Sequence, residues 1–181
     1  MEYNNPYNKY RDLPQIAYRI IEHLMLDDNA NIIWKLLKYN DPNAYSKDDL
    51  TQEEKAALIY DGTGHENDYN VFLDYMMDDA VKEEKTFLRI YPSYTTPRTR
   101  TTGIQDITIE VYVHSKINHL TNYSTRTDTI IQALLEVLNG CDIGGLGCMF
   151  FDNSISGYDR IQIIGQKPYK GKMLIMSVNL G

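Results

Sequence analysis

The first third of the chain places its hydrophobic residues at helical intervals. Asp12-Leu13-Pro14-Gln15 has the composition of a helix start, and Ile16, Ile20 and Leu24 follow at four-residue spacing. This pattern predicts a helix over residues 15–26. A second apolar stripe over residues 32–37, with Trp34 on its flank, predicts a second helix after a polar interruption at residues 27–29.

A third helix is expected after Thr51, because Glu54 stands three residues on and completes the spacing of a capping box. Ala56, Ala57, Ile59 and Tyr60 are expected to continue this helix until residues 61–64 end it. The stretch that follows, residues 61–84, holds eight acids and one base. Within it, five residues have the spacing of a short amphipathic helix: Val71, Phe72, Tyr75, Met76 and Ala80.

From residue 85 the period changes from helical to alternating. Residues 86–91 have the composition of a strand, and Ile107, Ile109, Val111 and Val113 alternate with polar residues in a second, half-buried strand. Residues 92–103 lie between them, are rich in threonine, and include prolines and two arginines. We expect this segment to be a long exposed loop.

The remaining pattern predicts a helix over residues 124–139 and strands over 146–151, 159–164 and 172–180. The expected fold class is therefore α+β: a mainly antiparallel sheet of about five strands packed against one long helix, with an N-terminal helical section. Residues 1–11 are expected to be an arm and 12–181 a single domain, in which the acidic residues 61–84 are an insertion.

The composition and charge of the chain argue against some classes of function. Residues 1–85 hold 18 acids and nine bases, a net charge of −9, and the rest of the chain has +2, which together give the chain's −7. Nonspecific nucleic-acid binding needs clustered cations, so this acidity argues against it. We expect no membrane span and no secretory signal, and the two cysteines, Cys141 and Cys148, are expected to be reduced, part-buried thiols.

Motifs that would indicate catalysis are weak. Tyr75-Met76-Met77-Asp78-Asp79 is similar to the paired aspartates of polymerase palms, but it has one methionine too many, and a solvated acidic face is the simpler interpretation. The glycines at 144–147 follow a helix, whereas phosphate loops precede one, so a turn is expected there. The four histidines have no zinc-ligand spacing. We expect a protein that is not an enzyme and has no cofactor or metal.

Binding to other protein chains is the remaining class of function that the sequence suggests. Tyrosine supplies 15 residues, and this side chain is enriched at protein interfaces. The loop over residues 92–103 has two arginines and no acid, and either contacts a neighbouring subunit or is a plain hairpin loop. The candidate residues for contacts with other subunits or partners are Arg89, Arg98, Arg100, Tyr91, Tyr94, Lys116, Tyr3, Tyr7 and Tyr10.

The order of elements over residues 86–181 resembles the tail-terminator and tail-completion proteins of long-tailed bacteriophages. The resemblance rests on the strand 87–91 after an N-terminal helix, a long loop, the strand 107–114, Arg126-Thr127-Asp128 at a helix start, and that helix ending at Asn139-Gly140. Neck proteins of large phages also look similar around residues 34–39 and 50–55. This is a pattern over most of the chain without a catalytic signature.

The resemblance implies a structural virion protein at the tail neck, assembled in the host cytoplasm. Such proteins form a homohexameric ring that caps the tail tube, ends its polymerisation and joins the tail to the head connector. The implied partners are further copies of the chain, the tail tube protein, the tail sheath and the head-to-tail connector proteins, with DNA passing through the lumen without specific binding. The alternatives are a head-side neck or head-closure protein and, from another class, a small metal-dependent cytosolic enzyme using Asp78 and Asp79.

Overall fold

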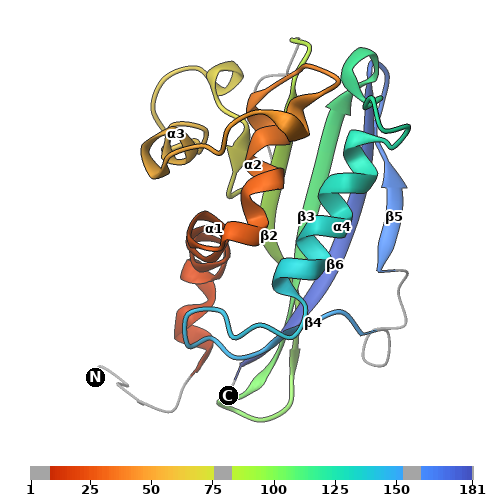
Figure 1. The fold of residues 1–181 in the computed structure, drawn as a ribbon. Coiled ribbons are helices and arrows are strands. Elements are labelled where there is room, and N and C mark those ends of the chain that lie inside the picture. The colour runs from red at the N-terminus through yellow and green to blue at the C-terminus, as the bar shows by residue number, and fades with distance from the viewer. Residues whose placement is uncertain (1–8, 76–82, 153–159, 181) are drawn as a thin grey trace.

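A computed structural model describes residues 9–75, 83–152 and 160–180 of the chain, without the side chains of Lys9 and Arg11. The described residues form a twisted sheet with helices on one face, an α+β fold (Figure 1). The helical elements, including short 3-10 turns (η), are η1 (Lys9–Gln15), α1 (Ile16–Leu26), η2 (Asp28–Ala30), α2 (Asn31–Lys38), η3 (Ala44–Ser46), α3 (Gln52–Ala56), η4 (Glu66–Asp68), η5 (Ser115–Ile117) and α4 (Arg126–Leu138). The strands are β1 (Val71–Phe72), β2 (Thr86–Pro97), β3 (Gly103–His114), β4 (Met149–Phe150), β5 (Ile161–Ile164) and β6 (Tyr169–Leu180).

The predicted helical stripes are the faces that the helices bury. Ile16, Ile20 and Leu24 on α1 are at most 1% exposed, and α1, α2 and α4 all contribute to one core with the inner face of the sheet. The sheet therefore packs against three helices, whereas the sequence predicted one long helix. Trp34 was expected on the flank of α2 but is fully buried, and its indole N–H donates to the carbonyl of Leu24 over 2.8 Å.

The sheet has the strand order β1-β2-β3-β6-β4, with β5 also pairing with β6. Among the described residues, β1 and β2 are parallel and the other four pairings are antiparallel, so the sheet is mixed. The expected α+β class is confirmed. A sixth strand arises because Val71 and Phe72, predicted as part of a short helix, pair with Leu88 and Arg89 as β1. Met76 and Ala80, which belong to the same predicted helix, lie outside the described residues.

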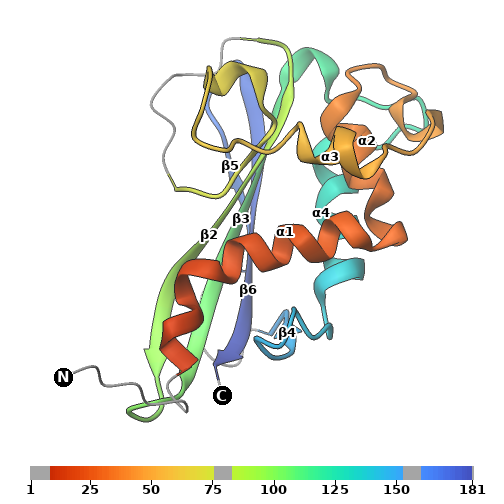
Figure 2. The ribbon, with the colours of Figure 1, turned by 90° about the vertical axis from the view of Figure 1, so that its left-hand side faces the viewer.

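The segment predicted as a long loop is mostly a hairpin of two 12-residue strands. β2 continues to Pro97 and β3 begins at Gly103, so residues 98–102 alone form the turn. Pro92 is tolerated inside β2 because the register shifts between Pro92 and Thr95, and because β1 pairs with β2 no further than Arg89. Figure 2 shows this hairpin extending beyond the helical layer at the end of the molecule where the described chain begins and ends.

The outer face of the sheet, opposite the helices, is polar and aromatic. Along β3, Ile107 and its alternate neighbours face the helices, so Thr108, Glu110 and Tyr112 face outward. One end of this outer face is covered by a small aromatic cluster of Phe72 and Phe87 with Tyr60, Tyr69, Tyr112 and Tyr169. Tyr60 and Tyr69 come from the acidic half, so these two tyrosines pack within the subunit. No helix among the described residues is long and apolar enough to cross a membrane.

Candidate interaction surface

Two of the predicted interface residues meet on the outer face of the sheet. Arg89 on β2 lies opposite Glu110 on β3, and its Nη1 is 2.9 Å from the Glu110 Oε2. The Tyr91 hydroxyl donates to the other carboxylate oxygen over 2.9 Å, and the Arg89 guanidinium carbon lies 5.7 Å from the centroid of the Tyr91 ring. Both charges of the Arg89–Glu110 pair are thus satisfied, and Tyr91 is held in a fixed orientation.

The electrostatics of this group keep the phenol neutral. Burial and the hydrogen bond to Glu110 raise the pKa of Tyr91 to about 12. Burial, with the Glu110 charge next, also raises the pKa of Tyr112. Neither tyrosine ionises at neutral pH, so this face offers aromatic rings and hydroxyl groups to a partner rather than a nucleophile.

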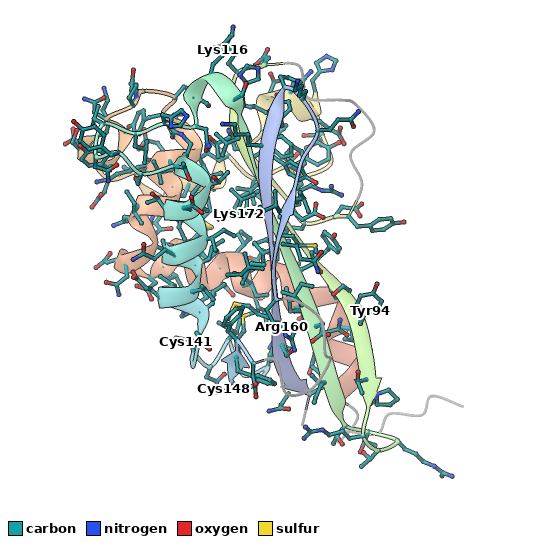
Figure 3. All side chains as sticks on the ribbon, turned by 90° about the vertical axis from the view of Figure 1, so that its right-hand side faces the viewer. Tyr94, Lys116, Cys141, Cys148, Arg160 and Lys172 are labelled. Carbon is teal, nitrogen blue, oxygen red and sulfur yellow. The ribbon has the colours of Figure 1, made fainter. Side chains whose placement is uncertain are left out.

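Beside this group lies an open pocket of about 560 Å³. It spans four strands, and its lining mixes aromatic, polar and aliphatic side chains: Tyr75, Tyr91, Pro92, Ser93, Tyr94, Thr108, Gln162, Met173 and Ile175. Tyr94 is 64% exposed, and Figure 3 shows it on the side of the sheet opposite the helices. The pocket has the aromatic and polar composition of a protein-contact surface.

A second group of predicted residues lies at the tip of the hairpin. Arg98 and Arg100 are exposed in the turn between β2 and β3. Tyr10, in η1, donates its hydroxyl to the carbonyl of Thr102, and therefore fastens the start of the described chain to the base of this turn. The remaining candidates in the N-terminal segment, Tyr3 and Tyr7, lie outside the described residues.

Lys116 lies apart from the other candidates. It belongs to η5, at the end of the molecule opposite the hairpin tip (Figure 3), and forms an ion pair with Glu84. The predicted residues therefore fall into three places: the outer face around Tyr91, the hairpin tip, and the η5 end.

Sequence reasoning did not single out Glu110, which joins Arg89 and Tyr91, although the alternation of β3 already placed it on the outward face. It also missed Ile163 on β5, which is 87% exposed. Glu110 could have been identified from its position opposite Arg89. That position follows from the register between β2 and β3, which could not be predicted while residues 92–103 were expected to be a long loop.

The candidate metal-binding aspartates, Asp78 and Asp79, lie outside the described residues. Within the described part of the chain, no group of three or more His, Cys, Asp or Glu side chains could hold a metal ion. Cys141 is half-buried, Cys148 is exposed, and both are free thiols.

In a comparison with known protein families, the model of the YomW family aligns with residues 30–178, which span most of the chain. The matched region begins at the last residue of η2 and ends two residues before the end of β6, so it includes the helices α2, α3 and α4 and all of the sheet except those two residues. No curated protein matches the chain.

Proposed function

Because the chain belongs to the YomW family, a phage-associated protein family, we propose that it is a structural protein of the phage tail. In this proposal, copies of the chain form a ring that caps the tail tube, ends its polymerisation and joins the tail to the head connector. Its place would be the neck of the virion.

The observation on which the proposal chiefly rests is the hairpin of β2 and β3. Its tip bears Arg98 and Arg100 and extends past the helical layer (Figure 2), so it can reach a neighbouring subunit. The order of elements also supports the proposal: an N-terminal helix, the paired strands β2 and β3, α4 starting at Arg126 and ending before Asn139, and the final strands follow the order that the resemblance to tail terminators implies.

The chemistry of the outer face fits a structural role. Charged groups there are already paired, as Arg89 is with Glu110, and the tyrosines have raised pKa values. Such groups contribute contact area and hydrogen bonds without a reactive nucleophile. A pocket of about 560 Å³ on the same face gives a neighbouring subunit or tube protein a concave surface to fill.

The test combines oligomeric state with tube capping. Light scattering after size exclusion should give the mass of a ring of identical subunits, either alone or in the presence of preformed tail tubes. Tubes assembled with the protein should stop elongating and show density at one end by electron microscopy.

A protein that stays monomeric at every concentration and leaves tube growth unchanged would contradict the proposal. If it binds isolated connector and not tubes, it is a head-side neck protein. If the monomer instead hydrolyses a phosphate ester with magnesium, and Asp78→Asn with Asp79→Asn abolishes that activity, the enzyme alternative is correct.

A further inference from the structure

One lateral edge of the molecule has an exposed apolar ridge. β5 pairs with β6 in the register Ile161 to Leu174 and Ile163 to Lys172. Ile163 is 87% exposed and Ile161 is 39% exposed. Because residues two apart on a strand share a face, both isoleucines project on the same side of the sheet edge. An edge strand with exposed apolar side chains offers a surface on which another chain can pack.

The opposite lateral edge has an apolar groove. The groove lies between α1, α3 and Ile59, encloses about 220 Å³, and is lined by Tyr18, Ile21, Glu22, Met25, Leu26, Gln52 and Ile59. Tyr18 at 59% and Leu26 at 71% exposure form its rim. Its volume is below the range typical of cofactor and ligand pockets, and suits one or two aliphatic side chains. Figure 1 shows α1 and α3 on one side of the molecule and β5 on the other.

The charges around the two features are opposite. Residues 160–180 contain three lysines, one arginine and no acid, and the arginine, Arg160, is buried in an ion pair with Asp106. Lys167 and Lys170 are exposed and, among the described residues, join no ion pair, whereas Lys172 pairs with Asp128. Around the groove, Glu22 belongs to the lining, and Asp28 and Glu53 are exposed nearby in sequence. Lys167 and Lys170 thus place positive charge on the segment that follows the ridge, and Glu22 places a carboxylate in the groove.

We propose that the β5 ridge of one copy of this chain docks into the α1–α3 groove of the next copy. The contact is heterologous: it joins two different surfaces, so each subunit keeps one free ridge or one free groove until a ring closes. It buries Ile163 and Leu26 at once and brings Lys170 towards Glu22. This inference rests on the proposed ring, and names two faces that meet in it besides the hairpin tip.

Disulfide trapping tests the contact directly. In a background with Cys141→Ser and Cys148→Ser, one chain has Ile163→Cys and a second chain has Leu26→Cys. Mixing the two under mild oxidation should give a covalent dimer that neither chain gives alone. A single chain with both cysteines should give a ladder of covalent oligomers up to the size of the ring.

The controls separate this inference from the ring proposal. Tyr123→Cys, at a fully exposed side chain in the turn before α4, replaces Leu26→Cys as the unrelated partner, and should give no dimer with the Ile163→Cys chain. A dimer of Ile163→Cys with itself would mean that two β5 edges pair symmetrically, and would overturn the inference. Assembly without any 163–26 disulfide would also overturn it but leave the ring proposal standing. Absence of assembly, alone or on tubes, would overturn both.

A charge exchange gives a second readout. Glu22→Lys and Lys170→Glu should each weaken self-association about tenfold, because each places like charges across the contact. The double variant should restore self-association to near the original affinity. Failure of the double variant to recover, with both single variants folded by circular dichroism, would place these two residues outside the contact.

Discussion

At the scale of single residues, the Arg126 side chain connects two distant parts of the backbone by hydrogen bonds to their carbonyl groups. It is fully buried at the start of α4, and it donates to the carbonyls of Ile117, Leu36, Tyr39 and Asp41 over 2.7 to 3.1 Å. The carbonyls of Leu36 and Tyr39 lie at the C-terminal end of α2, where carbonyl groups have no partner inside the helix. Arg126 therefore joins the end of α2 to the start of α4.

Burial lowers the pKa of Arg126 to about 10. The side chain thus stays charged at neutral pH, and its contribution does not vary with pH below that value. Because folded and unfolded chains both bind the proton below pH 10, this group adds no pH dependence to stability in the neutral range.

Replacing Arg126 should be severely destabilising. Arg126→Ala leaves four carbonyls without their donor, and we expect a loss of about 3–5 kcal/mol in the free energy of unfolding. Arg126→Lys keeps the charge but cannot span the same carbonyls, so it should also lose stability, though less. Urea denaturation gives the comparison, with exposed Arg98→Ala as the matched control that should leave the midpoint unchanged.

The sequence could not distinguish Arg126 from the exposed arginines. An arginine in a sequence is expected on the surface, and nothing local to residue 126 shows that the end of α2, some 90 positions earlier, lies against it. The helix it begins was predictable from its own apolar spacing. Trp34 is a similar case, because its burial depends on α1 packing over it.

At the scale of elements, α4 is joined to β6 through Asp128. The carboxylate lies in the first turn of α4, forms an ion pair with Lys172, and accepts from the Thr125 hydroxyl at the N-cap. The hydrogen bond to Lys172 and that to Thr125 lower the pKa of Asp128 below its usual value of 3.8. A carboxylate near a helix N-terminus is also favoured by the helix dipole.

This pair should give a measurable acid dependence. The folded pKa of Asp128 lies below the unfolded one, so its contribution is present above pH 3.8 and is lost as pH falls further, through the folded pKa. Asp128→Asn should lower stability by about 0.5–1 kcal/mol at pH 7, because the pair is partly exposed. The difference should shrink as pH falls below 3.8.

Urea midpoints measured from pH 7 to pH 3 would give that difference, with Glu136→Gln on the exposed side of α4 as the matched control. A constant difference between the Asp128→Asn variant and the original protein across this range would show that the carboxylate charge has no part in joining α4 to β6.

An element could be predicted from the sequence where the residues that determine it lie within that element, and not where pairing with a distant segment determines it. The capping box of Thr51 and Glu54 is present as expected, yet α3 ends at Ala56, because Ile59 pairs with Val71 beside β1. The alternation of β3 was sufficient to predict a half-buried strand. The extension of β2 through Pro92 could not be predicted, since prolines and threonines resemble loop composition and only pairing with β3 makes them a strand.

At the scale of the whole molecule, the charge of the chain is separated along its length. The hairpin tip with Arg98 and Arg100 is at one end, and the acidic residues of α3 and η4 are towards the other (Figures 1 and 2). Residues of opposite charge therefore lie in different parts of the molecule, which is compatible with contacts between unlike surfaces of successive copies in the proposed ring. Which residues form an interface depends on the other chain as well. The sequence of one chain therefore indicated candidate interface residues but not which of them lie together on the surface.

The hairpin tip gives the prediction that concerns the assembly itself. Arg98 and Arg100 are exposed, so Arg98→Glu with Arg100→Glu should leave the free energy of unfolding within about 0.5 kcal/mol of the original. If the tip contacts a neighbouring subunit or the tube, the same change should weaken assembly at least tenfold, because two attractive contacts become repulsive. Lys38→Glu with Lys47→Glu changes the net charge equally away from the hairpin, and should leave assembly unchanged. Light scattering and tube-length measurements compare the two double variants, and equal assembly of both would remove the hairpin tip from the interface.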